Sequence, residues 1–74
     1  MILAKWLANE RHARGLRAKT VAEEMEISAS ELSLYANQAR MPSEERRAAF
    51  ERYTLGKVRA AKDWPPVKNG KGHQ

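Results

Sequence analysis

Apolar residues recur at helical spacing in the first part of the chain, and polar residues occupy the positions between them. The apolar positions of the first two segments are Ile2, Leu3, Trp6 and Leu7, then Val21, Ala22 and Met25. Repeats of three and four residues place these side chains on one face of a helix. The pattern predicts one helix over residues 2–13, ended by Gly15, and a shorter helix over residues 18–25.

A capping motif marks the start of a third helix. In Ser28-Ala29-Ser30-Glu31 the Ser28 hydroxyl can accept a hydrogen bond from the Glu31 amide, while the Glu31 carboxylate reaches back to the Ser28 amide. This helix should begin at Ser28 and finish near Gln38. Its inward side chains are Leu32, Tyr35 and Ala36.

A proline and a serine mark the next boundary. The residue before Pro42 is pushed out of helical geometry, and Ser43 is a good N-cap with two acidic residues behind it. These signals predict a fourth helix over residues 44–54, ended by Gly56. Its inward side chains are Ala49, Phe50 and Tyr53.

The pattern weakens after Gly56. We expect residues 57–58 to be briefly extended, residues 59–64 to form one further helical turn, and Trp64 to dock on the domain. Residues 65–74 contain prolines, glycines and polar residues but a single apolar side chain, too few to offset the entropy lost on ordering. The sequence therefore predicts one domain over residues 1–64 and a disordered tail over residues 65–74.

The second and third predicted helices have the spacing of a helix-turn-helix. Ala22 lies in the first of them, Ile27 at the turn and Leu32 in the second, so that the three side chains close a small core. Ala22 must be small because the next helix crosses close above it. The fold class that follows is all-α, a compact bundle of four to five helices around a central helix-turn-helix.

Composition excludes several kinds of site. The 74 residues suffice for one domain with a small core, and the absence of cysteine removes disulfides, thiolate metal sites and thiol nucleophiles. His12 and His73 are too far apart in sequence, and too short of neighbouring ligands, to suggest a metal site. No grouping of serine, histidine and acid stands out. We expect no enzymatic activity, no cofactor and no metal.

Hydropathy bears on the location of the protein. No apolar run reaches the roughly 18 residues that a membrane-spanning helix needs. The first residues also become charged too early for a signal peptide. We expect a soluble, cytoplasmic protein with no membrane partner.

Charge is unevenly distributed along the chain, whose formal net charge is +5. Residues 1–19 carry five basic residues and one acid, and residues 46–74 carry eight basic residues and two acids. Residues 20–45 carry six acids and one basic residue. A basic balance favours an acidic partner such as nucleic acid or an acidic protein face. The acidic central block, however, contains the helix that would read DNA.

A set of short segments spread over residues 3–58 follows the pattern of a known family. The segments are Leu3, Trp6 and Leu7, then Val21-Ala22, Ile27-Ser28, Leu32-Ser33, Arg40-Met41-Pro42-Ser43 and Phe50-Glu51-Arg52-Tyr53-Thr54-Leu55-Gly56-Lys57-Val58. With these residues the chain resembles the phage Cro-type repressors and the related YdaS-like antitoxins, which have a lambda-repressor-like helix-turn-helix. Glu26 stands where this family usually has glycine, so we expect it to adopt left-handed geometry at a cost of about 1 kcal/mol.

The resemblance implies a transcription regulator, usually a repressor that binds double-stranded DNA as a homodimer with the third helix in the major groove. The candidate base-reading residues are Ala29, Ser30, Ser33, Leu34, Asn37 and Gln38. Asn37 and Gln38 can make bidentate contacts to adenine, and no arginine is placed to read guanine. The candidate phosphate or partner contacts are Arg14, Arg17, Lys19, Thr20, Arg40 and Ser43.

Two other interpretations stay open. In the first interpretation, the serines are ordinary helix caps or solvated residues, and the cluster of Arg14, Arg17 and Lys19 is an ordinary charged surface. Residues 28–38 contain no lysine or arginine, and the glutamates around them repel phosphate. The alternative function is therefore a phage regulator whose helix-turn-helix scaffold binds host RNA polymerase instead of an operator. In that case the basic first helix and residues 57–71 contact acidic polymerase surfaces.

Overall fold

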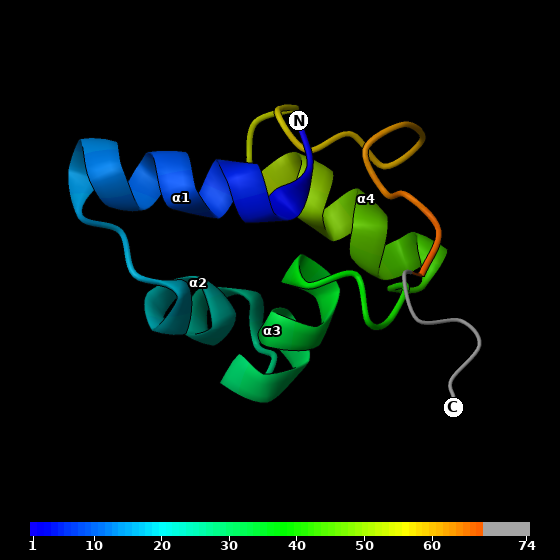
Figure 1. Cartoon of the computed structure of the whole chain (residues 1–74), viewed down its shortest axis with the longest axis horizontal. Helices are drawn as coiled ribbons and strands as arrows, with labels where there is room; N and C mark the ends of the chain where they lie inside the picture. The colour runs from blue at the N-terminus through cyan, green and yellow to red at the C-terminus, as the bar shows by residue number, and fades with distance from the viewer. Residues whose placement is uncertain (68–74) are drawn as a thin grey trace.

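Four helices account for the regular secondary structure in the computed structural model, which describes residues 1–67 (Figure 1). They are α1 (Leu3–Arg14), α2 (Ala18–Met25), α3 (Ala29–Ala36) and α4 (Glu44–Tyr53). No strand occurs among these residues, so the expected all-α class is confirmed. In Figure 1, α1 and α4 form the upper part of the molecule, and α2 and α3 form the lower part.

The first two helices end at residues in the left-handed region of backbone conformation. Gly15 follows α1 with a φ of 69°, and its amide donates to the Arg11 carbonyl. Glu26 follows α2 with a φ of 61°, so the expected left-handed glutamate is confirmed. Glycine adopts this region freely, whereas a residue with a Cβ loses about 1 kcal/mol there. The connection between α2 and α3 therefore carries local strain.

The start of α3 is capped by its serine alone. The Ser28 hydroxyl accepts a hydrogen bond from the Glu31 amide at 2.9 Å, as predicted. The second half of the predicted capping box is wrong, because the Glu31 carboxylate accepts from the Tyr35 hydroxyl instead of the Ser28 amide. Residues four apart are neighbours on a helix surface, so Tyr35 is within reach of this carboxylate.

The end of α3 comes earlier than predicted. The helix stops at Ala36, two residues before Gln38, and Gln38 has a φ of 62°. The amides of Ala39 and Arg40 both donate to the Leu34 carbonyl, at 2.8 and 3.3 Å. These bonds fold the backbone back over the last turn, so the chain leaves the helix axis before Gln38.

The exit from α4 is organised by a buried threonine. The helix ends at Tyr53, one residue before the predicted end, and its first turn is capped by the Ser43 hydroxyl as predicted. The Thr54 hydroxyl donates to the Phe50 carbonyl at 2.8 Å and accepts from the Val58 amide at 3.0 Å. Thr54 thus satisfies polar groups on both sides of the turn, which is what permits its own burial.

Beyond α4 the chain forms turns. Residues 57–58 bend, so the predicted extended piece is wrong, and the buried Val58 is drawn into the core by the Thr54 hydroxyl. A further helical turn was predicted over residues 59–64. The structure has a hydrogen-bonded turn there but no helix, and the Asp63 amide donates to the Arg59 carbonyl at 3.0 Å. Four helices in residues 1–67 fall within the predicted four to five.

Asp63 connects this last segment to the beginning of the chain. Its carboxylate lies 2.8 Å from the Met1 ammonium group and accepts from the Arg59 amide at 2.7 Å. The Met1 ammonium group also donates to the Lys57 carbonyl at 2.8 Å. The hydrogen bond from the ammonium group, followed by that from Arg59, lowers the pKa of Asp63.

Eight apolar residues form the buried core. They are Leu3, Trp6, Val21, Ala22, Leu32, Tyr35, Phe50 and Val58. Phe50 has no exposed surface, and its ring centroid lies 6.0 Å from that of Tyr35 and 5.3 Å from that of Trp64. The predicted docking of Trp64 is therefore confirmed, and it covers the core on the side of α4.

Ala22, Ile27 and Leu32 lie where α2 and α3 meet. Ala22 and Leu32 are 2% and 1% exposed, and Ile27 is half-buried against the core. The Ile27 amide donates to the Ala22 carbonyl at 3.0 Å, and α3 packs on both α2 and α1. The three residues 26–28 thus connect two helices whose facing side chains are buried, as the spacing predicts.

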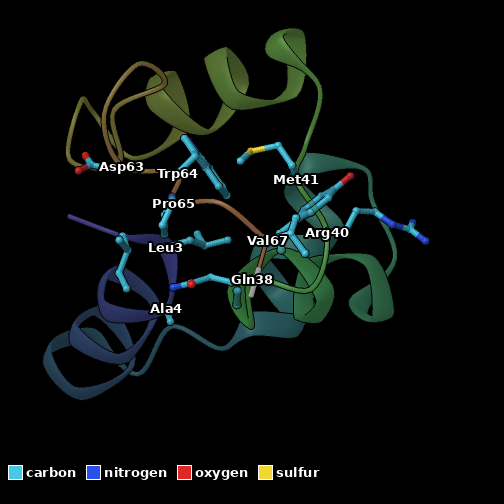
Figure 2. Close-up of a pocket in the computed structure, with 12 residues that line it drawn as sticks. Leu3, Ala4, Gln38, Arg40, Met41, Asp63, Trp64, Pro65 and Val67 are labelled. Carbon is cyan, nitrogen blue, oxygen red and sulfur yellow. The ribbon is translucent and has the colours of Figure 1, made fainter. Parts of the chain in front are cut away.

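The last described residues lie against the domain. Pro65 and Val67 are half-buried and line a small hollow with Leu3, Gln38 and Trp64 (Figure 2). Of the tail predicted to be disordered, residues 65–74, the structure describes residues 65–67. Residues 68–74, which include His73, lie outside the described part.

Replacing the strained glutamate with glycine should stabilise the protein. We expect Glu26→Gly to raise the free energy of unfolding by about 0.5–1 kcal/mol, because glycine relieves the left-handed strain and offsets part of that gain through its unfolded-state entropy. Urea denaturation followed by circular dichroism measures the change. Glu23→Gly, inside α2, is the matched control and should lower the same quantity by about 1 kcal/mol. Equal destabilisation by both variants would contradict the assigned strain.

Candidate nucleic-acid interface

The side of α3 that faces away from the core presents short polar and small side chains. Ala29, Ser30, Ser33 and Asn37 are all exposed. The Asn37 side-chain amide donates to the Ser33 hydroxyl at 3.3 Å, which holds the two predicted base-reading groups together one turn apart. The structure therefore brings four of the six predicted base-reading residues onto one solvent-facing surface.

The other two predicted base-reading residues are less exposed than these four. Leu34 is half-buried. Gln38 is also half-buried and lines the hollow beside Leu3 and Ala4 (Figure 2). Because α3 ends at Ala36 and Gln38 has a positive φ, its side chain is placed toward α1. The helical spacing of apolar residues did not predict this orientation of Gln38, because we expected the helix to continue to that residue.

The N-terminal end of α2 differs in charge from those of α3 and α4. Its N-cap is Arg17, which makes no side-chain cap, and its first turn contains exposed Lys19 and half-buried Thr20 but no acid. By contrast, α3 and α4 begin with serine caps and have glutamates in the first turn. First-turn amides have no acceptor within the helix, and the helix dipole favours negative charge there. Among α2, α3 and α4, the N-terminal end of α2 is therefore the one whose local charges suit an anion.

Arg14 is partly neutralised within its own helix. Its Nε lies 2.6 Å from Glu10 Oε1, and the arginine side chain is 64% exposed. The spacing of the two residues, four apart on a helix, is the signal from which this pair follows. Arg14 thus offers less free charge to a phosphate than Arg17 or Lys19.

A second group of polar residues lies in the segment that follows α3 and at the start of α4. Arg40 is exposed, and Ser43, although its oxygen caps α4, retains a hydroxyl proton to donate. Arg46 lines a surface hollow with Ser43 and was missed by sequence reasoning, although its position three residues after the cap places it beside Ser43. Arg47, in contrast, donates to the Pro42 carbonyl at 2.6 Å. In Figure 1 the α1–α2 connection and the α3–α4 connection lie on opposite sides of α3.

The four glutamates within residues 20–31 are arranged in two ways. Glu23 and Glu26 are exposed. Glu24 accepts a hydrogen bond from the Tyr53 hydroxyl of α4, and Glu31 accepts one from Tyr35 within α3. Two of the four carboxylates are therefore fixed by tyrosines, and the Glu24 pair also joins α2 to α4.

Tyr35 and Tyr53 donate these hydrogen bonds as neutral, protonated phenols. Burial is the first cause that raises the pKa of Tyr53 to about 12, and the hydrogen bond to Glu24 is the second. The pKa of Tyr35 is raised in the same direction, first by burial and then by the hydrogen bond to Glu31. At neutral pH the hydroxyls of Tyr35 and Tyr53 are therefore protonated donors.

Across residues 1–67 no three histidine, cysteine, aspartate or glutamate side chains gather as metal ligands would. Among the same residues no helix has both the length and the apolar character needed to cross a bilayer.

Comparison with known proteins gave no match. No family model, no curated protein and no solved structure matches this chain.

The burial of Tyr53, together with its hydrogen bond to Glu24, should make stability fall at high pH. Because the folded-state pKa of Tyr53 is raised from 10.0 to about 12, its contribution is present below pH 10 and is lost as the pH rises through about 12. Urea denaturation at pH 9, 10, 11 and 12 should therefore show a smaller fall in the free energy of unfolding for Tyr53→Phe than for the parent protein. Parallel pH profiles for the two proteins would show that Tyr53 does not titrate in this way.

Proposed function

We propose that this chain is a small phage-type transcription regulator, a Cro-like repressor that binds duplex DNA. In this proposal α2, residues 26–28 and α3 form a helix-turn-helix, and α3 enters the major groove. The observation that carries the proposal is the exposed polar face of α3, opposite a face that is buried against α2. Ala22 and Leu32 form the buried side, and Ser30 and Ser33 belong to the exposed side.

The side chains on this face define the kind of readout. Serine hydroxyls donate to or accept from several base edges, and the asparagine amide pairs in a bidentate manner with adenine. Ala29 offers a methyl group to thymine. Because this face has no arginine, guanine lacks its usual partner, and we expect modest base specificity supplemented by DNA shape.

Phosphate contacts are proposed on both sides of α3. On one side are Arg17, Lys19, Thr20 and the first-turn amides of α2, where the local charge suits an anion. On the other side are Arg40 and Ser43, with Arg46 beside them. Contacts on two flanks fix the orientation of a helix in a groove, while base edges supply the sequence preference.

Removing one basic residue from each flank tests the proposal. We expect Lys19→Ala and Arg40→Ala each to weaken duplex binding and to reduce the slope of log affinity against log salt by about 0.9 per lost contact. Fluorescence anisotropy with a labelled duplex between about 50 and about 200 mM salt measures both quantities. Lys62→Ala, an exposed lysine in the segment after α4, has the same charge change and should leave the slope unaltered.

The outcomes are distinct. No duplex binding by the parent protein at low salt would remove the DNA proposal. Binding that is unaffected by Lys19→Ala and Arg40→Ala would keep a DNA-binding protein but move the interface elsewhere. Circular dichroism of each variant shows that the helices are retained.

A second function is favoured by the exposed carboxylates. Glu23 and Glu26 lie at the end of α2 and in the turn that leads directly into α3. There they repel phosphate, whereas a basic protein face would attract them. The second candidate is therefore a phage regulator that uses the same scaffold to bind host RNA polymerase, with its basic segments meeting acidic polymerase surfaces.

Neutralising these two carboxylates separates the two functions. For a DNA-binding protein, Glu23→Gln with Glu26→Gln should strengthen duplex binding by removing repulsion. For a polymerase-binding protein, the same double variant should weaken capture of purified bacterial RNA polymerase. Glu51→Gln, on α4 and outside the proposed phosphate contacts, is the matched control, because the glutamine oxygen can still accept from the Ala60 amide. Polymerase capture that is absent or indifferent to the double variant would eliminate the second candidate.

A further inference from the structure

Leu55 is the most exposed large apolar residue in the described part of the chain. It is 87% exposed, whereas the other exposed large apolar residues in residues 1–67 are 37–40% exposed. It also has a φ of 57°, in the left-handed region that disfavours a side chain with a Cβ. A leucine at this position gains no burial and strains the backbone. Strain and apolar exposure at one residue indicate a contact with a partner.

The turn that carries Leu55 is held in place on both sides. The Leu55 amide donates to the Arg52 carbonyl at 3.1 Å, and the Gly56 amide donates to the Glu51 carbonyl at 2.8 Å. The buried Thr54 hydroxyl fastens the same turn to the core. Leu55 is therefore presented to solvent by a fixed backbone, and little conformational freedom is lost when it meets a partner.

Leu55 also lines a hollow of about 170 Å³. The walls of this hollow include Trp6 and Tyr53, whose rings pack edge to face with centroids 5.9 Å apart. An apolar cavity of about 150 Å³ accommodates a benzene molecule, so the hollow has room for one apolar or aromatic side chain. Leu55, Trp6 and Tyr53 together form what we call the Leu55 surface.

The chain that carries this surface is basic. Residues 52–59 contain three basic residues, Arg52, Lys57 and Arg59, and no acid. All three are exposed. Lys57 also lines the hollow, and among residues 1–67 its ammonium group forms no ion pair. A positive charge therefore lies at the edge of the apolar surface.

Two carboxylates that adjoin Lys57 are neutralised within the monomer. Glu10, which lines the same hollow, forms an ion pair with Arg14 at 2.6 Å. The Met1 ammonium group, which donates to the Lys57 carbonyl, pairs with Asp63 at 2.8 Å. The charge of Lys57 is left for a partner to neutralise, and that partner must be acidic.

We propose that the Leu55 surface binds an acidic segment of another protein, in which apolar side chains alternate with aspartate or glutamate. One apolar side chain of the segment enters the hollow, a second packs on Leu55, and a carboxylate pairs with Lys57. An anionic bilayer shares the negative charge, but membrane binding scales with the apolar area that is buried, and a single projecting leucine offers little. A protein segment fits both the hollow and the charge.

The Leu55 surface lies away from the face proposed to meet DNA. The turn after α4 lies at the top of the molecule in Figure 1, on the side away from α3. The proposal requires neither candidate function, and it adds an apolar anchor that charge attraction alone does not specify. Its test needs neither DNA nor polymerase, so its failure is distinguishable from the failure of either.

Selection of short random peptides displayed on phage, with the parent protein immobilised as the target, tests the proposal. We expect the recovered peptides to be enriched in aspartate and glutamate beside leucine, phenylalanine or tryptophan. Failure to recover any peptide would overturn the proposal. Recovery of peptides that are apolar but lack the acidic residues would also overturn it, because the partner would then be neutral.

Leu55→Gly tests the apolar contact with a recovered acidic peptide, labelled for fluorescence anisotropy. The variant should raise the dissociation constant at least about tenfold, because it removes the projecting side chain. Its unfolding temperature should be equal or higher, because glycine relieves the strain at this φ. Glu26→Gly places glycine at another exposed left-handed position and should leave the dissociation constant unchanged. A Leu55→Gly protein that binds as tightly as the parent would overturn the proposal.

A charge reversal tests the ionic contact with the same peptide. Lys57→Glu should weaken binding at least about tenfold, since it places like charges at the contact. A peptide whose acidic residues are replaced by lysine should bind the Lys57→Glu protein more tightly than it binds the parent. Lys62→Glu, an exposed lysine further along the chain, is the matched control. Equal effects of Lys57→Glu and Lys62→Glu would reflect general charge attraction alone and would overturn the assigned site.

Discussion

The packing of α2 against α3, with Ala22 and Leu32 both in the buried core, is the constraint on which the rest of the structure depends. Alanine contributes a single methyl group, so two helices joined by three residues can lie against each other with both side chains almost fully buried. A larger side chain at position 22 overpacks such a junction, typically by ~1–3 kcal/mol. The same packing leaves Ser30 and Ser33 in solvent. One small residue therefore sets both the buried and the exposed side of α3.

Charge is organised around this pair of helices in a way that the net value of +5 conceals. The N-terminal end of α2 has basic residues and no cap, whereas its C-terminal end has exposed glutamates. Tyr53 fixes Glu24 by a hydrogen bond, so part of the acidic surface is structural. The two ends of one eight-residue helix therefore suit opposite kinds of partner, which is the physical origin of the two candidate functions.

Much of the fold follows from the sequence because its signals are local. Apolar spacing and the caps at Ser28 and Ser43 predict four helices, with α2 predicted to the residue. The left-handed Glu26 was expected instead from the resemblance to the Cro-type family, which usually has glycine at this position. The wrong predictions concern positions whose conformation is determined by tertiary contacts. Thr54 turns Val58 inward and prevents an extended piece. Because α3 ends early, Gln38 does not join the predicted base-reading residues on the exposed side of the helix. Arg14, a predicted phosphate contact, forms an ion pair with Glu10 instead.

Three residues with side chains, Glu26, Gln38 and Leu55, occupy backbone positions that glycine would fill without strain. The left-handed geometry at each position lowers the free energy of unfolding by roughly 1 kcal/mol, in a domain for which that free energy is on the order of 5–15 kcal/mol. None of the three lies within α3 itself. Single substitutions in the connections can therefore recover stability that offsets destabilising changes in α3. In evolutionary terms, the choice of binding partner can drift while the scaffold remains above its folding threshold.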